Sequence, residues 1–124
     1  MTKKQEMLAH RKAQLLRSSN RLGSHSNCFR AYASETRSHI TKKFLIWLEL
    51  LKAGCKLYTE GIFLNGLRCD ILAIMPDGRC KVIEILESET DEECDLKTSN
   101  YPKDIDDIIK VREVDENTIK DILC

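Results

Sequence analysis

The stretch that decides the fold runs from residue 57 to residue 86 and reads LYTEGIFLNGLRCDILAIMPDGRCKVIEIL. Apolar residues alternate here with polar ones, and two turn signals interrupt the pattern, Asn65-Gly66 and Pro76-Asp77-Gly78. The pattern predicts an antiparallel meander of three strands, over residues 57–63, 67–74 and 79–86.

The second turn predicts which acidic residues face each other across the meander. Pro76-Asp77-Gly78 suits a three-residue hairpin loop, because Pro and Asp accept the right-handed positions of a type I turn and Gly accepts the left-handed position after it. In that register Asp70 lies directly opposite Glu84, with Cβ atoms about 4.5–5.5 Å apart. Two carboxylates so close repel each other unless a positive charge lies between them, and a divalent cation is the obvious candidate.

The position of Glu60 depends on the first turn, and two registers are open. A three-residue loop at residues 64–66 places Glu60 opposite Asp70, so that three carboxylates converge on one patch. The usual two-residue Asn-Gly turn instead places Glu60 beside Ile71 and directs it to the other face of the sheet.

Carboxylate oxygens clustered in this way suit Mg²⁺ or Mn²⁺. Such an ion lowers the pKa of a bound water and stabilises the charge that builds up during phosphodiester hydrolysis. The alternative interpretation is that the acids are solvent-facing strand positions, paired with Arg68, Arg79 or Lys81. Against it, Asp70 and Glu84 lie within apolar strands, where a carboxylate requires a partner.

Helices are predicted on the N-terminal side of the meander. Residues 1–22 carry apolar side chains at helical spacing, and the turn formers of residues 23–27 end that helix as a linker. A second helix is expected to begin with Ser34 as its cap and to end at Gly54. Its polar face carries three groups at successive steps of four, namely Glu35, His39 and Lys43.

On the C-terminal side, residues 89–100 predict a helix or a helical loop, and residues 108–114 a fourth strand. Residues 115–123 predict a short final helix with Asp115 as its cap. The element order is therefore expected to be α-α-β-β-β-α-β-α.

Charge divides the chain into two parts. Residues 1–43 carry a net charge of +8 and residues 44–124 a net charge of −8, although the 20 basic and 20 acidic residues balance overall. Two interpretations of the basic part are open: its helix has a solvated basic outer face, or it is an arm that binds the phosphates of a nucleic acid. The side chains that would do so are Lys3, Lys4, Arg11, Lys12, Arg17, Arg21, Arg30 and Arg37.

Chain length, apolar runs and cysteine content indicate the number of domains and the cellular location. The 124 residues suit one compact domain, and no apolar run approaches the roughly 20 residues of a membrane-spanning helix. The six cysteines include no C-x-x-C pair, and no signal peptide is recognisable. We therefore expect a cytoplasmic protein, not embedded in a membrane, whose thiols are reduced and mostly buried.

The residues from Ser34 to Ser88 resemble the core of the PD-(D/E)XK nuclease superfamily, in particular its competence-protein CoiA-like branch. That branch combines a helix bearing H-x-x-x-K, a strand bearing Glu, an R-x-D strand and a strand that ends in I-E-hydrophobic-x-x-S. The corresponding residues are His39 and Lys43, then Glu60, then Arg68 with Asp70, and then Ile83-Glu84-Ile85 with Ser88.

The resemblance implies an α/β fold with a restriction-endonuclease-like core, in which a mixed central sheet of about four strands is flanked by helices. The nuclease domain would span residues 34–124, behind a basic N-terminal helical arm over residues 1–33. The implied activity is metal-dependent cleavage of nucleic acid, in the first place DNA. A nuclease that cuts both strands commonly works as a homodimer, so the chain could pair through its long helix or an edge strand.

The resemblance also implies roles for individual residues. Asp70 and Glu84 would be ligands of Mg²⁺ or Mn²⁺, with Glu60 as an auxiliary acid. Glu35 or His39 would be the helix-borne residue near the metal.

One position departs from the family pattern, because Leu86 stands where a lysine is expected two residues after the second acid. Lys43 is the candidate substitute, and Lys81 a weaker one because alternation directs it away from Glu84. The alternative function is therefore an inactive nuclease-fold protein that binds nucleic acid or a protein partner.

Overall fold

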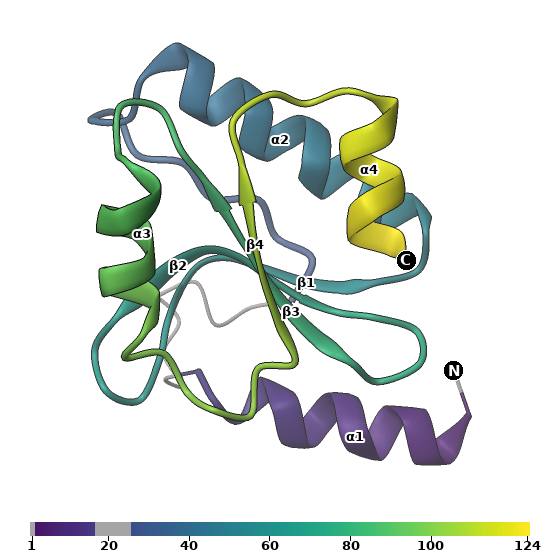
Figure 1. The fold of residues 1–124 in the computed structure, drawn as a ribbon. Coiled ribbons are helices and arrows are strands. Elements are labelled where there is room, and N and C mark those ends of the chain that lie inside the picture. Colours follow the sequence, from purple (N-terminus) through teal and green to yellow (C-terminus); the bar gives the residue numbers. More distant parts are fainter. Residues whose placement is uncertain (1, 17–25) are drawn as a thin grey trace.

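The described residues of the computed structural model, 2–16 and 26–124, form a mixed four-stranded sheet with helices on both faces (Figure 1). Along the chain, the elements are α1 (Lys3–Ala13), α2 (Arg37–Lys52), β1 (Lys56–Ile62), β2 (Arg68–Ile74), β3 (Cys80–Ile85), α3 (Asp91–Thr98), β4 (Asp107–Val111) and α4 (Glu116–Leu123). The sheet order is β1-β2-β3-β4, with antiparallel pairs up to β3 and a parallel pair between β3 and β4. The predicted α/β class and the mixed sheet of four strands flanked by helices are confirmed.

Both hairpins use three-residue loops. The Met75 amide donates to the Arg79 carbonyl at 2.8 Å, and Gly78 has a φ of +91°. The first hairpin repeats this arrangement, with the Phe63 amide donating to the Leu67 carbonyl at 2.8 Å. The sequence left two registers open for this hairpin. The structure has the three-residue loop, and the pairs Thr59–Ile71 and Gly61–Cys69 set Glu60 level with Asp70.

Two of the predicted element boundaries were wrong at the N-terminal side. α1 ends at Ala13 rather than at residue 22, because Leu16 leaves the helix to form a bridge with Phe63. Residues 17–25, which include Arg17, Arg21 and most of the expected linker, lie outside the described residues. α2 is capped by Thr36 rather than Ser34, since the Thr36 hydroxyl accepts the amide hydrogen of His39 at 3.1 Å.

The later elements follow the prediction more closely. α3 lies within the expected residues 89–100, and Asp115 caps α4 by accepting the Thr118 amide at 2.9 Å. β4 ends at Val111 rather than at residue 114, because its partner on β3, Ile85, is the last residue of that strand.

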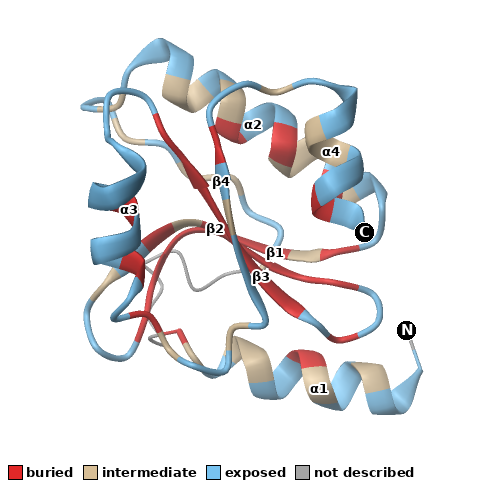
Figure 2. Ribbon diagram, in the orientation of Figure 1, coloured by how far each residue is buried: buried red, intermediate tan, exposed pale blue. Residues whose placement is uncertain are grey.

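Most of the buried apolar residues that the structure describes pack in two clusters, one on each face of the sheet. The first joins β1, β2 and β3 to α2 and α4, for example through Ile46, Ile71 and Ile122. The second lies beneath α1, which contributes Ala9, and it includes Tyr101 from the segment after α3. Figure 2 shows the burial concentrated on the strands, with the outer faces of the helices exposed.

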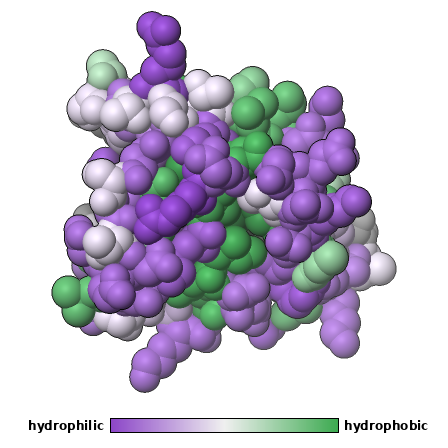
Figure 3. Space-filling model, turned by 45° about the horizontal axis from the view of Figure 1, so that its top comes forward, coloured by the Kyte–Doolittle hydropathy of each residue, from purple (hydrophilic) through white to green (hydrophobic). Residues whose placement is uncertain are grey.

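The molecular surface carries most of the charged residues. In the view of Figure 3 polar side chains cover most of the face, and apolar ones gather near its centre. All six cysteines are free thiols, of which Cys28 and Cys124 are exposed and four are buried. No helix in the described part of the chain has the length and apolar character that crossing a membrane requires.

Candidate functional site

The sheet changes its alternation of faces at Asp70. On β2, Ile71 belongs to the cluster under α2 and α4, whereas Cys69, two residues earlier, belongs to the cluster under α1. On the neighbouring strand, Glu60 has a φ of +53° and is skipped in the pairing of β1 with β2. Such a conformation costs a residue other than glycine about 1–3 kcal/mol, so the surrounding contacts must hold it. The break lets polar side chains meet here between α2 and the sheet.

Asp70 and Glu84 lie side by side where β2 and β3 meet. The Ile85 amide donates to Asp70 Oδ2 at 2.8 Å, and the Asp70 amide lies 3.4 Å from Glu84 Oε2. Each carboxylate therefore reaches the backbone of the other strand. The β2–β3 register that the sequence predicted is confirmed by the pairing of Ile71 with Ile83.

A chain of alternating charges runs from Asp70 into the interior. His39 Nε2 lies 3.4 Å from Asp70 Oδ2, and His39 Nδ1 lies 2.7 Å from Glu35 Oε2. The Lys43 ammonium donates to both oxygens of Glu35 at 2.9 Å and to Glu60 Oε1 at 2.8 Å. Lys43 is fully buried. The structure thus connects five of the predicted site residues in one network.

Glu84 has different neighbours, which sequence reasoning missed. Its Oε1 contacts the Tyr101 hydroxyl and lies 3.5 Å from the Lys97 ammonium. Both neighbours come from the segment between β3 and β4, which the parallel crossover carries back over the sheet. The sequence offered no motif for this contact, since Tyr101-Pro102 indicates only the end of a helix.

The electrostatics of the site follow from burial and these contacts. Burial, together with the charge of Asp70, raises the pKa of Glu84 to about 7. Burial also acts to raise the pKa of Asp70, but hydrogen bonds from His39 and the Ile85 amide hold it below its usual value. The hydrogen bond to Asp70, supported by Glu35, raises the pKa of His39 to about 9. At neutral pH His39 is therefore a cation, and Asp70 is already ionised beside Glu84.

These pKa shifts predict that the protein becomes less stable as the pH rises. A group with a raised pKa stabilises the folded state below its unfolded pKa and loses that contribution above its folded pKa. For Glu84 the loss falls between about pH 4.5 and 7, and for His39 between about pH 6.5 and 9. We expect the free energy of unfolding to fall by about 3 kcal/mol or more from pH 5 to pH 9, measured by urea denaturation without metal. A free energy of unfolding that stays level or rises from pH 5 to pH 9 would contradict the raised pKa values of Glu84 and His39.

A pocket of about 260 Å³ opens over the carboxylate pair. Its lining residues are His39, Asp70, Glu84, Ile85, Leu86, Glu89, Glu93, Cys94 and Lys97. Leu86 contributes an apolar wall and is itself buried. The lining includes two cations, His39 and Lys97. A solute that reaches Asp70 and Glu84 therefore passes close to positive as well as negative side chains.

The three carboxylates that one of the two open registers would bring together do not form a metal-binding group among the described residues. Across residues 2–16 and 26–124, no group of three or more His, Cys, Asp and Glu side chains is arranged to hold a metal ion. Glu60 is level with Asp70 in register, but its carboxylate is turned to the Lys43 ammonium. The same contact occupies Lys43, and Lys81 is directed to α4, where it donates to the Ile122 carbonyl.

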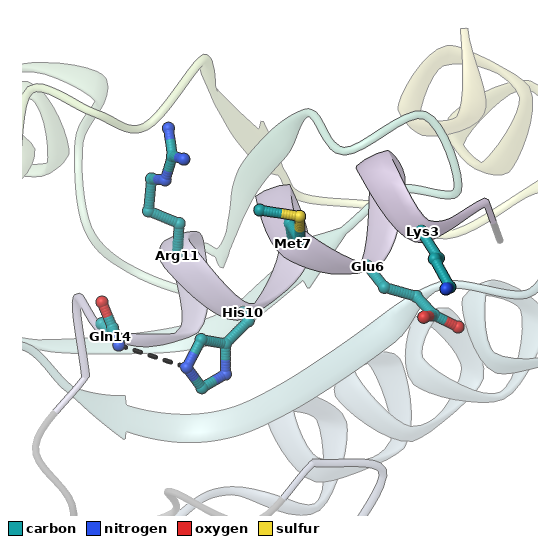
Figure 4. A pocket seen from close by; sticks show the side chains of 6 residues that line it. All are labelled: Lys3, Glu6, Met7, His10, Arg11 and Gln14. Atoms are coloured by element: carbon teal, nitrogen blue, oxygen red, sulfur yellow. Dashed lines mark hydrogen bonds between the residues drawn. The ribbon is translucent and has the colours of Figure 1, made fainter.

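The basic residues expected to bind nucleic acid fall into two groups. Lys3, Lys4, Arg11 and Lys12 are on α1, which packs on the sheet face opposite α2. Lys3 and Arg11 line a shallow pocket on the outer face of that helix (Figure 4), whereas Lys12 is engaged by Asp106 at 3.3 Å. Arg30 precedes α2, where its amide donates to the Thr59 hydroxyl at 2.7 Å, and Arg37 is the first residue of α2.

Comparison with known proteins identified no relative of this chain. No family model, no curated protein and no solved structure matches the chain.

Proposed function

We propose that this protein is a metal-dependent nuclease that hydrolyses phosphodiester bonds in nucleic acid, with DNA as its substrate. One observation supports the proposal above all. Negative and positive side chains alternate along the network of the site, in the order Glu60, Lys43, Glu35, His39 and Asp70. The alternation ends at Asp70. There Glu84 follows Asp70, and among the described residues no cation lies between the two carboxylates.

The two carboxylates fit a divalent cation of the Mg²⁺ or Mn²⁺ type. In proteins Mg²⁺ is usually held by one or two carboxylates and keeps several waters, while a substrate phosphate supplies further oxygens. Two protein carboxylates are thus sufficient for a site of this kind. When bound, the ion would lower the pKa of a water and stabilise the charge that develops at phosphorus.

The other charged side chains of the site, inside and outside the pocket, have separate roles. His39 is fixed by Glu35 at Nδ1, so its Nε2 proton is directed at Asp70 and holds that carboxylate in place. Lys97 lines the pocket with its side chain half exposed, and it offsets negative charge near Glu84. Glu60 and Lys43 are buried behind Glu35 and support the position of His39 from within.

The test is cleavage of supercoiled plasmid and of fluorescent oligonucleotides by the purified chain in Mg²⁺ or Mn²⁺. We expect cleavage in either metal, none in a chelator, and unchanged cleavage in Glu49→Gln, a substitution of an exposed acid on α2 away from the pocket. DNA and RNA that both stay intact in Mg²⁺ and in Mn²⁺ would reject the proposal.

A second candidate function, binding of nucleic acid without cleavage, is favoured by one specific observation. Neither position at which the family resemblance would place a basic group offers a free one, since Leu86 is apolar and Lys43 is sealed between Glu35 and Glu60. Retention of an oligonucleotide at low salt, combined with no cleavage in any metal, would support this candidate instead.

A further inference from the structure

Arg68 and Tyr32 form a stacked pair at the start of β2. The guanidinium carbon of Arg68 lies 5.0 Å from the centre of the Tyr32 ring, which is the distance of a cation–π contact. Arg68 is exposed, and within the described part of the chain no carboxylate forms an ion pair with it. The pair therefore presents a positive charge to solvent in a fixed orientation.

Both members of the stacked pair are attached to the candidate site. The Tyr32 amide donates to Glu35 Oε1 at 2.9 Å, and Glu35 in turn holds His39. The Arg68 carbonyl oxygen lies 2.8 Å from the Tyr101 hydroxyl, which also contacts Glu84. Because Arg68 precedes Asp70 by two residues on the same strand, their backbones are about 7 Å apart along β2.

The chemistry of the stacked pair suits a phosphate. A guanidinium that lies over an aromatic ring keeps its edge N–H groups free, and it loses little rotamer entropy when it binds. Those N–H groups match two oxygens of a phosphate in a bidentate contact. The pocket itself carries Asp70, Glu84, Glu89 and Glu93, so a polyanionic strand needs a cation close beside these acids.

We propose that Arg68, oriented by Tyr32, binds the phosphate next to the one that is cleaved. The inference rests on the proposed nuclease function and specifies its substrate class. The substrate is a strand with at least two phosphates, rather than a mononucleotide ester. The contact positions the strand without reading its bases, because it is made to the backbone.

The test measures binding of a short fluorescent single-stranded DNA and of a dinucleotide with one phosphodiester, in Ca²⁺ and at low salt. Arg68→Gln should weaken binding of the longer strand about tenfold and leave the dinucleotide unaffected. It should also reduce the salt dependence of binding by about one phosphate contact. Tyr32→Leu should show part of this loss, and Tyr32→Phe, which keeps the ring, should behave like the wild type.

Arg79→Gln is the matched control, because it removes the same charge from an exposed arginine in the turn at the other end of β2, where Arg79 pairs with Asp77 at 2.7 Å. Equal effects of Arg68→Gln and Arg79→Gln would overturn the inference even if the protein cleaves DNA. A loss of dinucleotide binding equal to that of the longer strand would overturn it too, as would a wild type that binds no strand at low salt. If Arg68→Gln weakens binding of the longer strand in a protein that never cleaves, the contact of Arg68 with a backbone phosphate is supported and only the hydrolysis is rejected.

Discussion

Replacing Glu84 with glutamine should abolish metal-dependent cleavage and at the same time make the metal-free protein more stable. The amide keeps the shape of the side chain and its contact with Tyr101, but it removes the charge that faces Asp70. Loss of one of two carboxylate ligands should reduce the cleavage rate by roughly 10²–10³-fold or more, on the scale seen when one charge-stabilising group is removed from an active site. Binding of Mn²⁺ or Ca²⁺, measured by calorimetry, should fall with it.

The gain in stability has the same origin as the raised pKa of Glu84. Burial and the Asp70 charge destabilise the ionised Glu84 carboxylate, and a neutral amide avoids both costs. At pH 8 the urea midpoint of Glu84→Gln should therefore exceed that of the wild type in a chelator, and Mn²⁺ should raise only the wild-type midpoint.

Asp70→Asn provides the contrasting variant. It should also abolish cleavage, but it removes one of the two carboxylates that pair with the part-buried His39 cation, the other being Glu35, and should lower stability. If both variants were equally stable and both still cleaved DNA, the carboxylate pair would have no part in a metal site.

The register of the meander could be predicted from its turns, because turn chemistry acts locally. Gly78 occupies a left-handed position that other residues adopt only at a cost, so a three-residue loop follows from the sequence alone. Turn chemistry did not decide to which face of the sheet Glu60 is directed, since Asn65-Gly66 suits a two-residue and a three-residue loop equally well. The deciding contacts are non-local ones, above all the bridge from Leu16 to Phe63 and the Leu64 amide that donates to the Leu15 carbonyl.

The remaining parts of the site could not be predicted because they depend on distant segments and on backbone strain. Nothing in the sequence around Lys97 and Tyr101 indicates Glu84 as a neighbour, since the crossover between β3 and β4 fixes that contact in three dimensions. The positive φ of Glu60 is equally hidden, as glutamate has no preference for it. Thr36 rather than Ser34 caps α2, and this shift leaves Glu35 outside the helix, where it accepts from the Tyr32 amide, His39 and Lys43.

Replacing Lys43 with methionine should lower the free energy of unfolding by about 3–5 kcal/mol, the usual result of removing one partner from a buried ionic network. Methionine fills a similar volume, so the loss comes from charge rather than from a cavity. Glu35 and Glu60 would be left facing each other without the ammonium that now lies 2.9 and 2.8 Å from their oxygens. Urea denaturation at pH 7 measures the difference, and Lys52→Met, at the exposed end of α2, is the matched control with an expected change below about 1 kcal/mol.

A rescue experiment separates this structural role of Lys43 from a catalytic one. Adding Glu60→Gln to Lys43→Met removes one of the two uncompensated charges, so it should restore part of the lost stability and, with it, part of the cleavage. The physical reason is that Lys43 holds Glu35, and through Glu35 the ring of His39, without reaching the pocket itself. If Lys43→Met were as stable as Lys52→Met yet inactive, Lys43 would act on the reacting groups directly, as the substitute for the lysine that Leu86 replaces.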